Sequence, residues 1–309
     1  MSSVIQTENL VKKFRRVEAL KGLNLQVPQG AIYALVGPNG AGKTTAIKVL
    51  MNILEPTSGR AQILGADSTQ LEGKAFAAIG YVSENQELPL WMRVDSFLAY
   101  LRPFYPTWDR ELENELVKKL ELPLDRKLRH LSRGMKMKAA LASVLAYHPK
   151  LIVLDEPFSG LDPLVRDELI ESMLERAEEA TVLVSSHDLG EIESFASHVG
   201  YLEEGTLLFS DEMAALADRF REVELTLDAT ATVPPNLPES WMQASAAASV
   251  VQFIDSSFNE ERTTAEIGRV FGEHRNLTFT PMSLRSIFLA TAKTRRGAKE
   301  AHEPDRKHF

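Results

Sequence analysis

Residues 37–45 read Gly37-Pro38-Asn39-Gly40-Ala41-Gly42-Lys43-Thr44-Thr45, and this stretch decides the fold of the chain. It fits the pattern G-x-x-x-x-G-K-[ST], in which a glycine-rich loop leads into a lysine and a hydroxyl side chain. The apolar residues 31–36 precede it and predict a buried strand. Residues 45–51 follow with apolar side chains at helical spacing and predict a helix. A strand, a glycine loop and a helix in this order are the context that a phosphate-binding loop requires.

The residue types in this loop match the chemistry of phosphate binding. Gly37, Gly40 and Gly42 allow successive backbone N–H groups to approach phosphate oxygens closely, and the helix N-terminus adds its positive dipole end. Lys43 supplies a charge for the β- and γ-phosphates, and the Thr44 hydroxyl is placed to hold Mg²⁺. A glycine-rich turn that merely contains a lysine is the alternative, and both flanking segments disfavour it. The sequence therefore predicts a site for a nucleoside triphosphate with Mg²⁺.

A second pattern ends in two carboxylates. Residues 151–154 are apolar and predict a strand buried on both faces, and Asp155 and Glu156 follow directly. A buried strand is not expected to end in carboxylates without a partner, because desolvating an unpaired charge is costly. Mg²⁺ at the phosphate loop is the expected partner of Asp155, and Glu156 is the candidate to orient or deprotonate the attacking water. The alternative, a helix cap or a turn pair, is disfavoured by the phosphate loop upstream.

Two further side chains are candidates for nucleotide contacts, and each has a structural alternative. Residues 181–186 predict a third buried strand, and His187 follows at its C-terminal end, where ligands gather in α/β sheets. A lone histidine is most often structural, but this position favours a contact with the γ-phosphate. Phe14 lies in the polar stretch 12–16 and either stacks on a nucleobase or belongs to a small satellite core. Spacing alone does not choose between these two roles of Phe14.

Composition limits the class of protein. The chain has 309 residues, a formal net charge of −8 and no cysteine. Its longest apolar stretch, residues 139–147, is far shorter than the roughly 18 residues that a membrane span needs. The lack of cysteine suits the cytosol, and the negative net charge argues against a general nucleic-acid binder. The sequence predicts a globular cytoplasmic protein with no nucleic-acid partner.

Composition and pattern also divide the chain into segments. Residues 1–220 hold the motifs described above, preceded by alternating stretches that predict an antiparallel β beginning. Within them, residues 95–147 carry helical patterns interrupted by prolines, which predicts a helical subdomain. Residues 221–292 predict a small α/β domain, and residues 293–309, rich in Lys, Arg and Glu, predict a flexible charged tail.

With these pieces in order, the chain resembles the ATP-binding subunit of an ABC transporter over about residues 3–219. The resemblance implies an α/β fold with a P-loop NTPase core, an antiparallel β subdomain and a helical subdomain, and it assigns ATP binding to the whole phosphate loop. It places Phe14 where the family has the aromatic side chain that stacks on adenine, and residues 221–292 resemble the C-terminal appendage of export-type members. The matching motifs are the phosphate loop, the signature Leu131-Ser132-Arg133-Gly134-Met135, the strand Leu151-Ile152-Val153-Leu154-Asp155-Glu156-Pro157, the dimer-interface loop Ser159-Gly160-Leu161-Asp162, and the switch histidine His187.

The signature departs from the family pattern. The usual signature is Leu-Ser-Gly-Gly-Gln, whereas here Arg133 replaces a glycine and Met135 replaces the glutamine. Ser132 and Gly134 are retained, and the resemblance assigns them to the γ-phosphate of ATP held by the other subunit. A serine at a helix N-terminus and a glycine that permits close approach keep the donors for that anion.

A second departure lies in the loop after the predicted strand at 79–82. The family normally has a glutamine there, but Glu84 stands at the aligned position and Gln86 follows two residues later. Either side chain is a candidate to contact Mg²⁺ or water and to report the nucleotide state to a membrane partner. Position favours Glu84.

The resemblance also implies a mechanism and partners. Two copies, expected as a homodimer, face head to tail, with each ATP between the phosphate loop of one and the signature of the other and with Asp162 at the interface. ATP binding closes the dimer and drives a separate transmembrane permease, so a peripheral ATPase of an exporter at the inner face of the cell membrane is expected. A nucleotide-gated regulatory subunit with little ATPase activity is the alternative, motivated by the altered signature and opposed by Glu156 and His187. A soluble ATPase acting on DNA or ribosomes is disfavoured, because neither a heptad run nor an internal repeat is visible.

Overall fold

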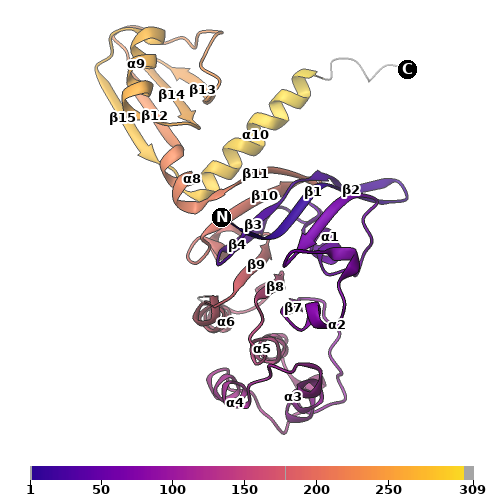
Figure 1. Ribbon diagram of the computed structural model, residues 1–309. Helices are drawn as coiled ribbons and strands as arrows, with labels where there is room; N and C mark the ends of the chain where they lie inside the picture. Colours follow the sequence, from indigo (N-terminus) through magenta and orange to yellow (C-terminus); the bar gives the residue numbers. More distant parts are fainter. Residues whose placement is uncertain (1, 178, 303–309) are drawn as a thin grey trace. The chain divides into compact units, whose positions relative to one another are not determined.

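The computed structural model of the chain describes residues 2–177 and 179–302. It divides into two compact units, one that ends at Asp211 and one that begins at Glu212 (Figure 1). Sequence analysis placed this boundary after residue 220. The short helix α8 (Met213–Arg219) accounts for the difference, because the backbone N–H of Phe258 donates to the carbonyl of Arg219 at 2.8 Å and holds the end of α8 to the second unit.

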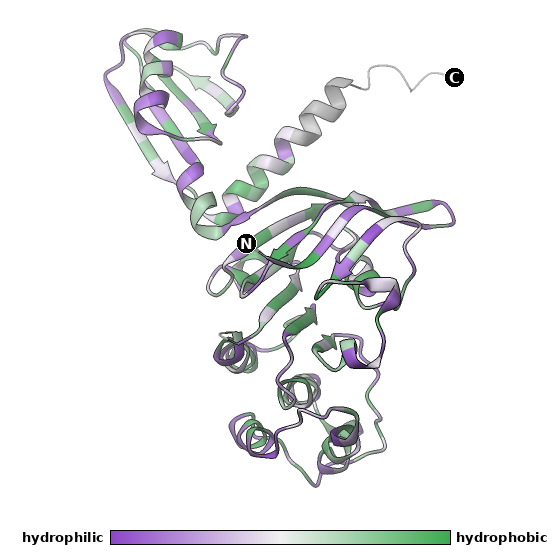
Figure 2. Cartoon of the chain, viewed as in Figure 1, coloured by the Kyte–Doolittle hydropathy of each residue, from purple (hydrophilic) through white to green (hydrophobic). Residues whose placement is uncertain are grey.

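A six-stranded sheet organises the first unit, with strand order β11-β10-β4-β9-β8-β7. Each neighbouring pair from β10 to β7 is parallel. Every residue of β8 and β9 is buried, as expected for apolar strands covered on both faces, and Figure 2 shows these strands in green. The strands at β4, β7, β8 and β9 were predicted, whereas β10 and β11 were not. Their bounds are β4 (Ile32–Val36), β7 (Ile79–Ser83), β8 (Leu151–Asp155), β9 (Thr181–Ser186), β10 (His198–Glu203) and β11 (Thr206–Glu212).

A second, antiparallel sheet contains the first three strands of the chain, which come before β4. Its strands follow the order β2-β1-β5-β6, with β3 also paired to β1. One buried apolar cluster joins this sheet, the helix α1 (Lys43–Leu50) and the parallel sheet, and it includes Ile5, Leu23, Ile47 and Leu183. The bounds are β1 (Ser3–Phe14), β2 (Val17–Leu23), β3 (Gln26–Pro28), β5 (Ser58–Ile63) and β6 (Ala66–Asp67).

Helices follow β7, as the sequence predicted for residues 95–147. The carboxylate of Asp109 caps the second of them, accepting the backbone N–H of Glu111 at 2.8 Å. The buried Glu113 holds this region together, because it binds Arg102 and accepts the indole N–H of Trp108 at 2.7 Å. The three helices are α3 (Val94–Leu101), α4 (Arg110–Lys119) and α5 (Arg133–Leu145). The remaining α-helices of the first unit are α2 (Gly73–Phe76), α6 (Pro163–Ala177) and α7 (Leu189–Ile192).

The second unit is a small antiparallel sheet with strand order β13-β14-β12-β15. Val223, Leu225, Phe253 and Ile267 form its core, the last of them from a helix that packs on the sheet. The alternation at residues 223–227 and the apolar run at 250–254 predict β12 and β14, and the apolar face of residues 284–291 predicts the final helix, whereas β13, α9 and β15 were not assigned from the sequence. The bounds are β12 (Arg221–Thr226), β13 (Trp241–Ala247), β14 (Val250–Asp255), α9 (Glu260–Phe271), β15 (Asn276–Pro281) and α10 (Leu284–His302).

The last helix is longer than the sequence analysis expected. Ser283 caps α10, and its Oγ accepts the backbone N–H of Ser286 at 3.2 Å. The expected flexible tail begins at residue 293, yet α10 continues through His302. The stretch 284–302 lacks proline and is rich in Ala, Lys and Arg, which favour helix over coil. Residues 303–309 of the expected tail lie outside the described residues.

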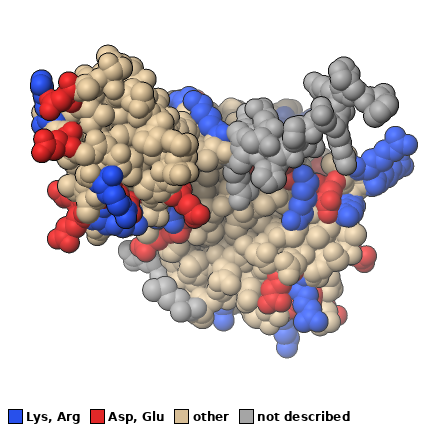
Figure 3. Space-filling model, turned by 90° about the horizontal axis from the view of Figure 1, so that it is seen from above, with Lys and Arg blue, Asp and Glu red and all other residues tan. Residues whose placement is uncertain are grey.

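The surface in Figure 3 has mixed charge. Lys and Arg side chains lie near Asp and Glu side chains on this face, with uncharged residues between them. In the part of the chain that the structure describes, every helix is too short or too polar to pass through a bilayer.

The contact between β7 and α5 gives a test of the packing. A Cβ on Gly80 of β7 would lie 2.1 Å from Cγ1 of Val144 of α5. We expect Gly80→Ala to lower the free energy of unfolding by about 1–3 kcal/mol, the usual effect of overpacking a core, as measured by urea denaturation.

Gly73→Ala is the matched control for this experiment. Apart from its chain neighbours and the backbone of its own helix, no atom of the described residues lies within 4 Å of a Cβ placed on Gly73. The urea midpoint of Gly73→Ala should therefore stay close to that of the parent chain. Equal midpoints for the two variants would contradict the close approach of β7 to α5.

Candidate active site

The phosphate loop joins β4 to α1 and is held by close backbone contacts. The N–H of Gly37 donates to the carbonyl of Ser186 at 3.3 Å, and a Cβ on Gly37 would lie 2.0 Å from the carbonyl oxygen of Leu202. Gly40 and Gly42 have φ angles of 81° and 110°, which glycine adopts without steric cost. The loop leads directly to the N-terminus of α1, where backbone N–H groups without helical partners and the helix dipole favour an anion.

The carboxylate of Asp155 ends β8 and is only 2% exposed. Its Oδ1 accepts hydrogen bonds from Oγ1 of Thr44 at 3.0 Å and from Oγ of Ser185 at 2.7 Å. Burial raises the pKa of the Asp155 carboxyl above its usual value, and the hydrogen bonds from Ser185 and Thr44 oppose this rise. A hydroxyl and a carboxylate oxygen therefore lie side by side next to the phosphate loop.

Glu156 lies between a cation and an imidazole. Its Oε1 is 3.1 Å from Nζ of Lys43, and its Oε2 is 2.8 Å from Nδ1 of His187. Lys43 is 5% exposed and also donates to the carbonyl of Gly37 at 2.6 Å. The φ of Glu156 is 52°, a left-handed value that is uncommon for a residue with a side chain and that is found more often at functional sites. Three predicted site residues from three separate segments thus meet at this carboxylate.

Ser185 was not predicted, and it bonds both the carboxylate of Asp155 and the backbone of Glu156. Besides the bond to Asp155, its Oγ accepts the backbone N–H of Glu156 at 2.9 Å. The available signal was a hydroxyl residue near the end of an otherwise apolar strand. The next residue, Ser186, donates to Oε2 of Glu191 at 2.7 Å, and burial raises the pKa of the Glu191 carboxyl. This second bond ties the start of α7 to the end of β9, on either side of His187.

The signature residues begin α5 and pack against α6. Oγ of Ser132 accepts the backbone N–H of Met135 at 3.2 Å and caps the helix. Gly134 is buried, and a Cβ there would lie 2.9 Å from Cγ1 of Val165. Asp162 accepts the backbone N–H of Val165 at 3.1 Å at the start of α6. Within one chain, Val165 therefore connects the signature to the loop that follows β8.

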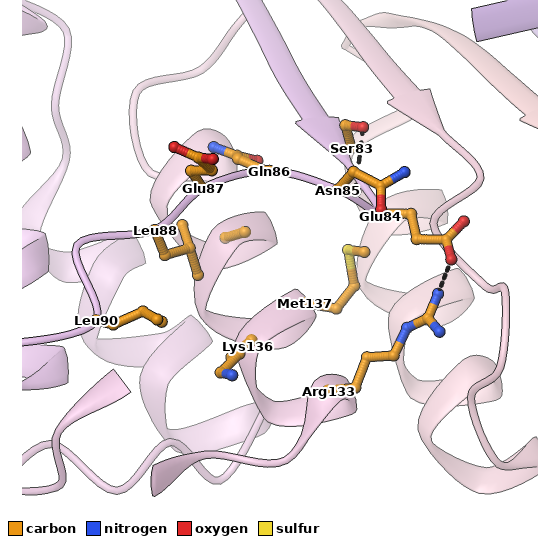
Figure 4. A pocket seen from close by; sticks show the side chains of 11 residues that line it. Ser83, Glu84, Asn85, Gln86, Glu87, Leu88, Leu90, Arg133, Lys136 and Met137 are labelled. Atoms are coloured by element: carbon orange, nitrogen blue, oxygen red, sulfur yellow. Dashed lines mark hydrogen bonds and ion pairs between the residues drawn. The ribbon is translucent and has the colours of Figure 1, made fainter. Parts of the chain in front are cut away.

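A cavity of about 620 Å³ lies between the loop after β7 and helix α5 (Figure 4). The backbone N–H of Glu84 donates to the backbone carbonyl of Asp155 at 2.9 Å, so the loop is joined to the end of β8. The carboxylate of Glu84 forms an ion pair with Arg133, and Gln86 also lines the cavity. Side chains from both elements form the wall: Ser83, Glu84, Asn85, Gln86, Glu87, Leu88, Leu90, Arg133, Lys136, Met137 and Ala140.

Phe14 lies at the end of β1, paired with Val17 of β2. Its side chain is 42% exposed, and Nζ of Lys12 lies 5.1 Å from the ring centroid. This exposure fits a side chain that offers its ring to a ligand better than a satellite core residue. Its contact with adenine stays a prediction.

The donors of Thr44 and Asp155 fit Mg²⁺. This ion takes one or two protein oxygen ligands and completes its octahedron with phosphate oxygens and water. Among the residues that the structure describes, no three His, Cys, Asp or Glu side chains gather into a metal site. The two oxygens beside the phosphate loop suit a cation that arrives with a nucleotide.

These features define a P-loop nucleoside triphosphatase, and comparison with known proteins gives its family. A family model described as ABC transporter matches residues 20–159. The ABC transporter ATP-binding protein YxlF of Bacillus subtilis, itself uncharacterized, is 30% identical over 82% of this chain and 84% of its own length. The bacitracin transport ATP-binding protein BcrA of Bacillus licheniformis is 33% identical over 67% of this chain and 69% of its own. The chain belongs to the ABC transporter ATP-binding proteins and is an ATP-binding, ATP-hydrolysing subunit.

Structural comparison agrees with this assignment. A solved structure described as the ATP-binding subunit of an ABC transporter aligns with a TM-score of 0.64 and 27% identity, covering 69% of this chain and 92% of that chain. The predicted fold class, a P-loop core with antiparallel and helical parts and a small C-terminal appendage, is confirmed.

The contacts of Ser185 lead to a prediction about Mg²⁺ binding at Asp155. Ser185→Ala removes a hydrogen bond to the Asp155 carboxylate and the acceptor for the Glu156 N–H. Because hydrogen bonds to charged groups contribute about 1.5–3 kcal/mol, we expect the Mg²⁺ concentration for half-maximal ATP hydrolysis to rise roughly tenfold or more. Steady-state hydrolysis against a Mg²⁺ titration measures this.

Ser143→Ala is the control for the loss of a buried hydroxyl. The Oγ of Ser143 bonds only a carbonyl of its own helix among the described contacts, that of Ala140 at 2.7 Å. Ser143→Ala should leave the Mg²⁺ dependence of ATP hydrolysis unchanged. A Ser185→Ala variant with a normal Mg²⁺ titration would show that Ser185 does not position Asp155.

Proposed function

We propose that this chain is the ATPase subunit of an exporter and that the ends of β4, β8 and β9 carry its chemistry. The observation that supports this most strongly is the contact of Glu156 with both Lys43 and His187, directly beside the Thr44–Asp155 pair. The phosphate loop binds the triphosphate through backbone N–H groups and Lys43. Thr44 and Asp155 would hold Mg²⁺, which would neutralise phosphate charge when bound.

Glu156 acts on the attacking water. Its carboxylate is held from two sides, so one oxygen faces Lys43 and the other faces His187. Phosphate oxygens compete with Glu156 for the Lys43 ammonium, since an ammonium binds the group with the greater negative charge more strongly. ATP binding then frees Oε1 of Glu156 to orient the water and accept its proton. His187, on the other side, contacts the γ-phosphate and keeps the carboxylate in place.

A second copy of the chain completes each site. Ser132 and Gly134 lie at the N-terminus of α5, where a hydroxyl and backbone N–H groups can bind an anion. The phosphate loop lies in a different part of the same unit, at the N-terminus of α1. Two copies arranged head to tail bring the two helix N-termini to one ATP from opposite sides. Asp162, at the start of α6, lies at the interface of that homodimer.

A transmembrane permease is the second partner, and the surface near residues 84–105 is its contact. Two cavities of about 620 and 600 Å³ share Gln86, Glu87 and Leu88 in their walls. Large apolar side chains in this region are exposed: Trp91 by 70% and Phe104 by 61%. Exposed apolar groups of this size beside a groove are typical of a protein interaction site. No described helix spans a bilayer. The proposal places the permease on a separate chain and this subunit at the inner face of the membrane.

Export is the direction that we propose. BcrA of Bacillus licheniformis is named for bacitracin transport, and a solved structure described as a bacterial Atm1-family ABC exporter aligns with a TM-score of 0.62 and 26% identity. A regulatory subunit with little ATPase activity would not require the Glu156–His187 pair, and the pair is assembled here at 2.8 Å. The retained cap of Ser132 on α5 further favours a working motor.

Mixed variants test the shared sites. Lys43→Ala removes the phosphate-loop cation, and Ser132→Arg blocks the signature; each homodimer should lose hydrolysis by roughly 10²-fold or more. In an equal mixture, half of the dimers are mixed, and each has one site with both defects and one intact site. About a quarter of the sites should therefore regain activity.

Hydrolysis is measured for each variant alone and for mixtures at constant total protein. Recovery in the mixture that follows the fraction of mixed dimers is the expected result. If the mixture is as inactive as each variant alone, the ATP sites are not shared between two copies of the chain.

A further inference from the structure

The two departures from the family pattern contact each other in this chain. Glu84 replaces the glutamine of the loop after β7, and Arg133 replaces a glycine of the signature. They are 49 residues apart in the sequence, yet their charged groups form an ion pair across the cavity wall, drawn as the dashed line in Figure 4. A carboxylate and a guanidinium have replaced two uncharged residues at a single point of contact.

This ion pair connects three segments of the chain: the loop after β7, the signature at the start of α5, and the loop after β8. The backbone N–H of Glu84 is bonded to the carbonyl of Asp155 at 2.9 Å, so its loop is tied to the end of β8. Arg133 is the first residue of α5 and lies between Ser132 and Gly134. Its guanidinium lies against Gly160 in the loop after β8, where a Cβ would be 2.9 Å from Nη1 of Arg133.

Charge explains why the two replacements suit each other. Glu84 is 26% exposed, and the residue to which its backbone is bonded, Asp155, carries a second, buried carboxylate. A carboxylate in place of glutamine adds negative charge on the side of the site where phosphates bind. Arg133 neutralises this charge, and its own side chain is 47% exposed, so the pair is only partly screened by water. Without Arg133, the Glu84 carboxylate would lose its counter-ion; without Glu84, the Arg133 guanidinium would lose its anchor.

We propose that Arg133 is a positioning residue that acts through Glu84: the pair holds the loop after β7, the signature and the loop after β8 in one arrangement during ATP hydrolysis. The inference rests on the proposed function, because Ser132 and Gly134 beside Arg133 are the residues that meet the ATP of the second copy. Two combinations of residues 84 and 133 are compatible: glutamine with glycine, and glutamate with arginine. Glutamate with glycine and glutamine with arginine are not.

Four versions of the full chain test this: the parent, Glu84→Gln, Arg133→Gly, and the double variant. We expect Arg133→Gly to lower kcat by about fivefold, the upper range for a partly exposed ion pair. Adding Glu84→Gln to Arg133→Gly should restore kcat to within about twofold of the parent, although the same substitution alone lowers it. Arg133→Lys should keep part of the parent activity, because it retains the cation but not the planar fork.

Binding and stability measurements separate positioning from a general loss of structure. The affinity of a fluorescent ATP analogue for the dilute protein should be equal in all four versions, because the phosphate loop is intact in each. Lys136→Ala is the matched control, since Lys136 is a cation of the same helix that lines the same cavity. It should leave kcat unchanged, and melting temperatures verify that the variants fold.

Additive effects of the two substitutions on kcat would overturn the inference. It would also be overturned if Arg133→Gly behaved like Lys136→Ala. Failure of the proposed function would give a different result, because the mixture of Lys43→Ala and Ser132→Arg would then recover no hydrolysis. If that mixture recovers activity but the effects of Glu84→Gln and Arg133→Gly on kcat are additive, only the role of the ion pair is excluded.

Discussion

The buried carboxylate of Asp155 is the constraint on which the rest of this structure depends. It ends a strand that is covered on both faces, and two hydroxyls, from Thr44 on α1 and Ser185 on β9, donate to one of its oxygens. Ser185 reaches Asp155 only if β9 pairs with β8 in the observed register, and Thr44 reaches it only if α1 begins beside the end of β8. A buried charge without these bonds would be strongly destabilising. The site and the sheet therefore both require the observed placement of α1 and β9 beside Asp155.

The register of the parallel strands shows this requirement. Asp155 of β8 lies opposite Ser185 of β9, and Ser186 lies opposite Val36 at the end of β4. The phosphate loop, the two carboxylates and His187 therefore leave the sheet at the same edge. A shift of one residue in β9 would turn the Ser185 hydroxyl to the other face of the sheet and leave Asp155 with one donor fewer. The apolar strands position the chemistry by packing, and hydrogen bonds select the register.

Sequence patterns predict the parts of this site that depend on local order along the chain. The phosphate loop between β4 and α1 and the carboxylates after β8 are examples, because strand, loop and helix signals are adjacent there. Ser185 was not predicted, since its role comes from a neighbouring strand that is thirty residues away in sequence from the carboxylate it binds. The Glu84–Arg133 contact was not predicted for the same reason. Each residue departs from the family pattern in the sequence, but only the fold brings the two together. In the second unit, β13 was missed because most of its residues are small or polar, and its Trp241 packs on Phe253 in the folded sheet. The helix α9 has apolar side chains at helical spacing, including the core residue Ile267, so its signal was present in the sequence and was overlooked.

The central claim is that Glu156, held between Lys43 and His187, drives hydrolysis in a dimer that ATP closes. The most direct test is Glu156→Gln, which preserves size and hydrogen bonding but cannot accept a proton. Its ATP hydrolysis with Mg²⁺ is compared with that of the parent chain, and light scattering follows its mass with and without ATP. The account predicts a loss of turnover of about 10²–10⁴-fold together with accumulation of an ATP-bound dimer. Turnover close to that of the parent, or a variant that binds ATP and stays monomeric, would contradict it.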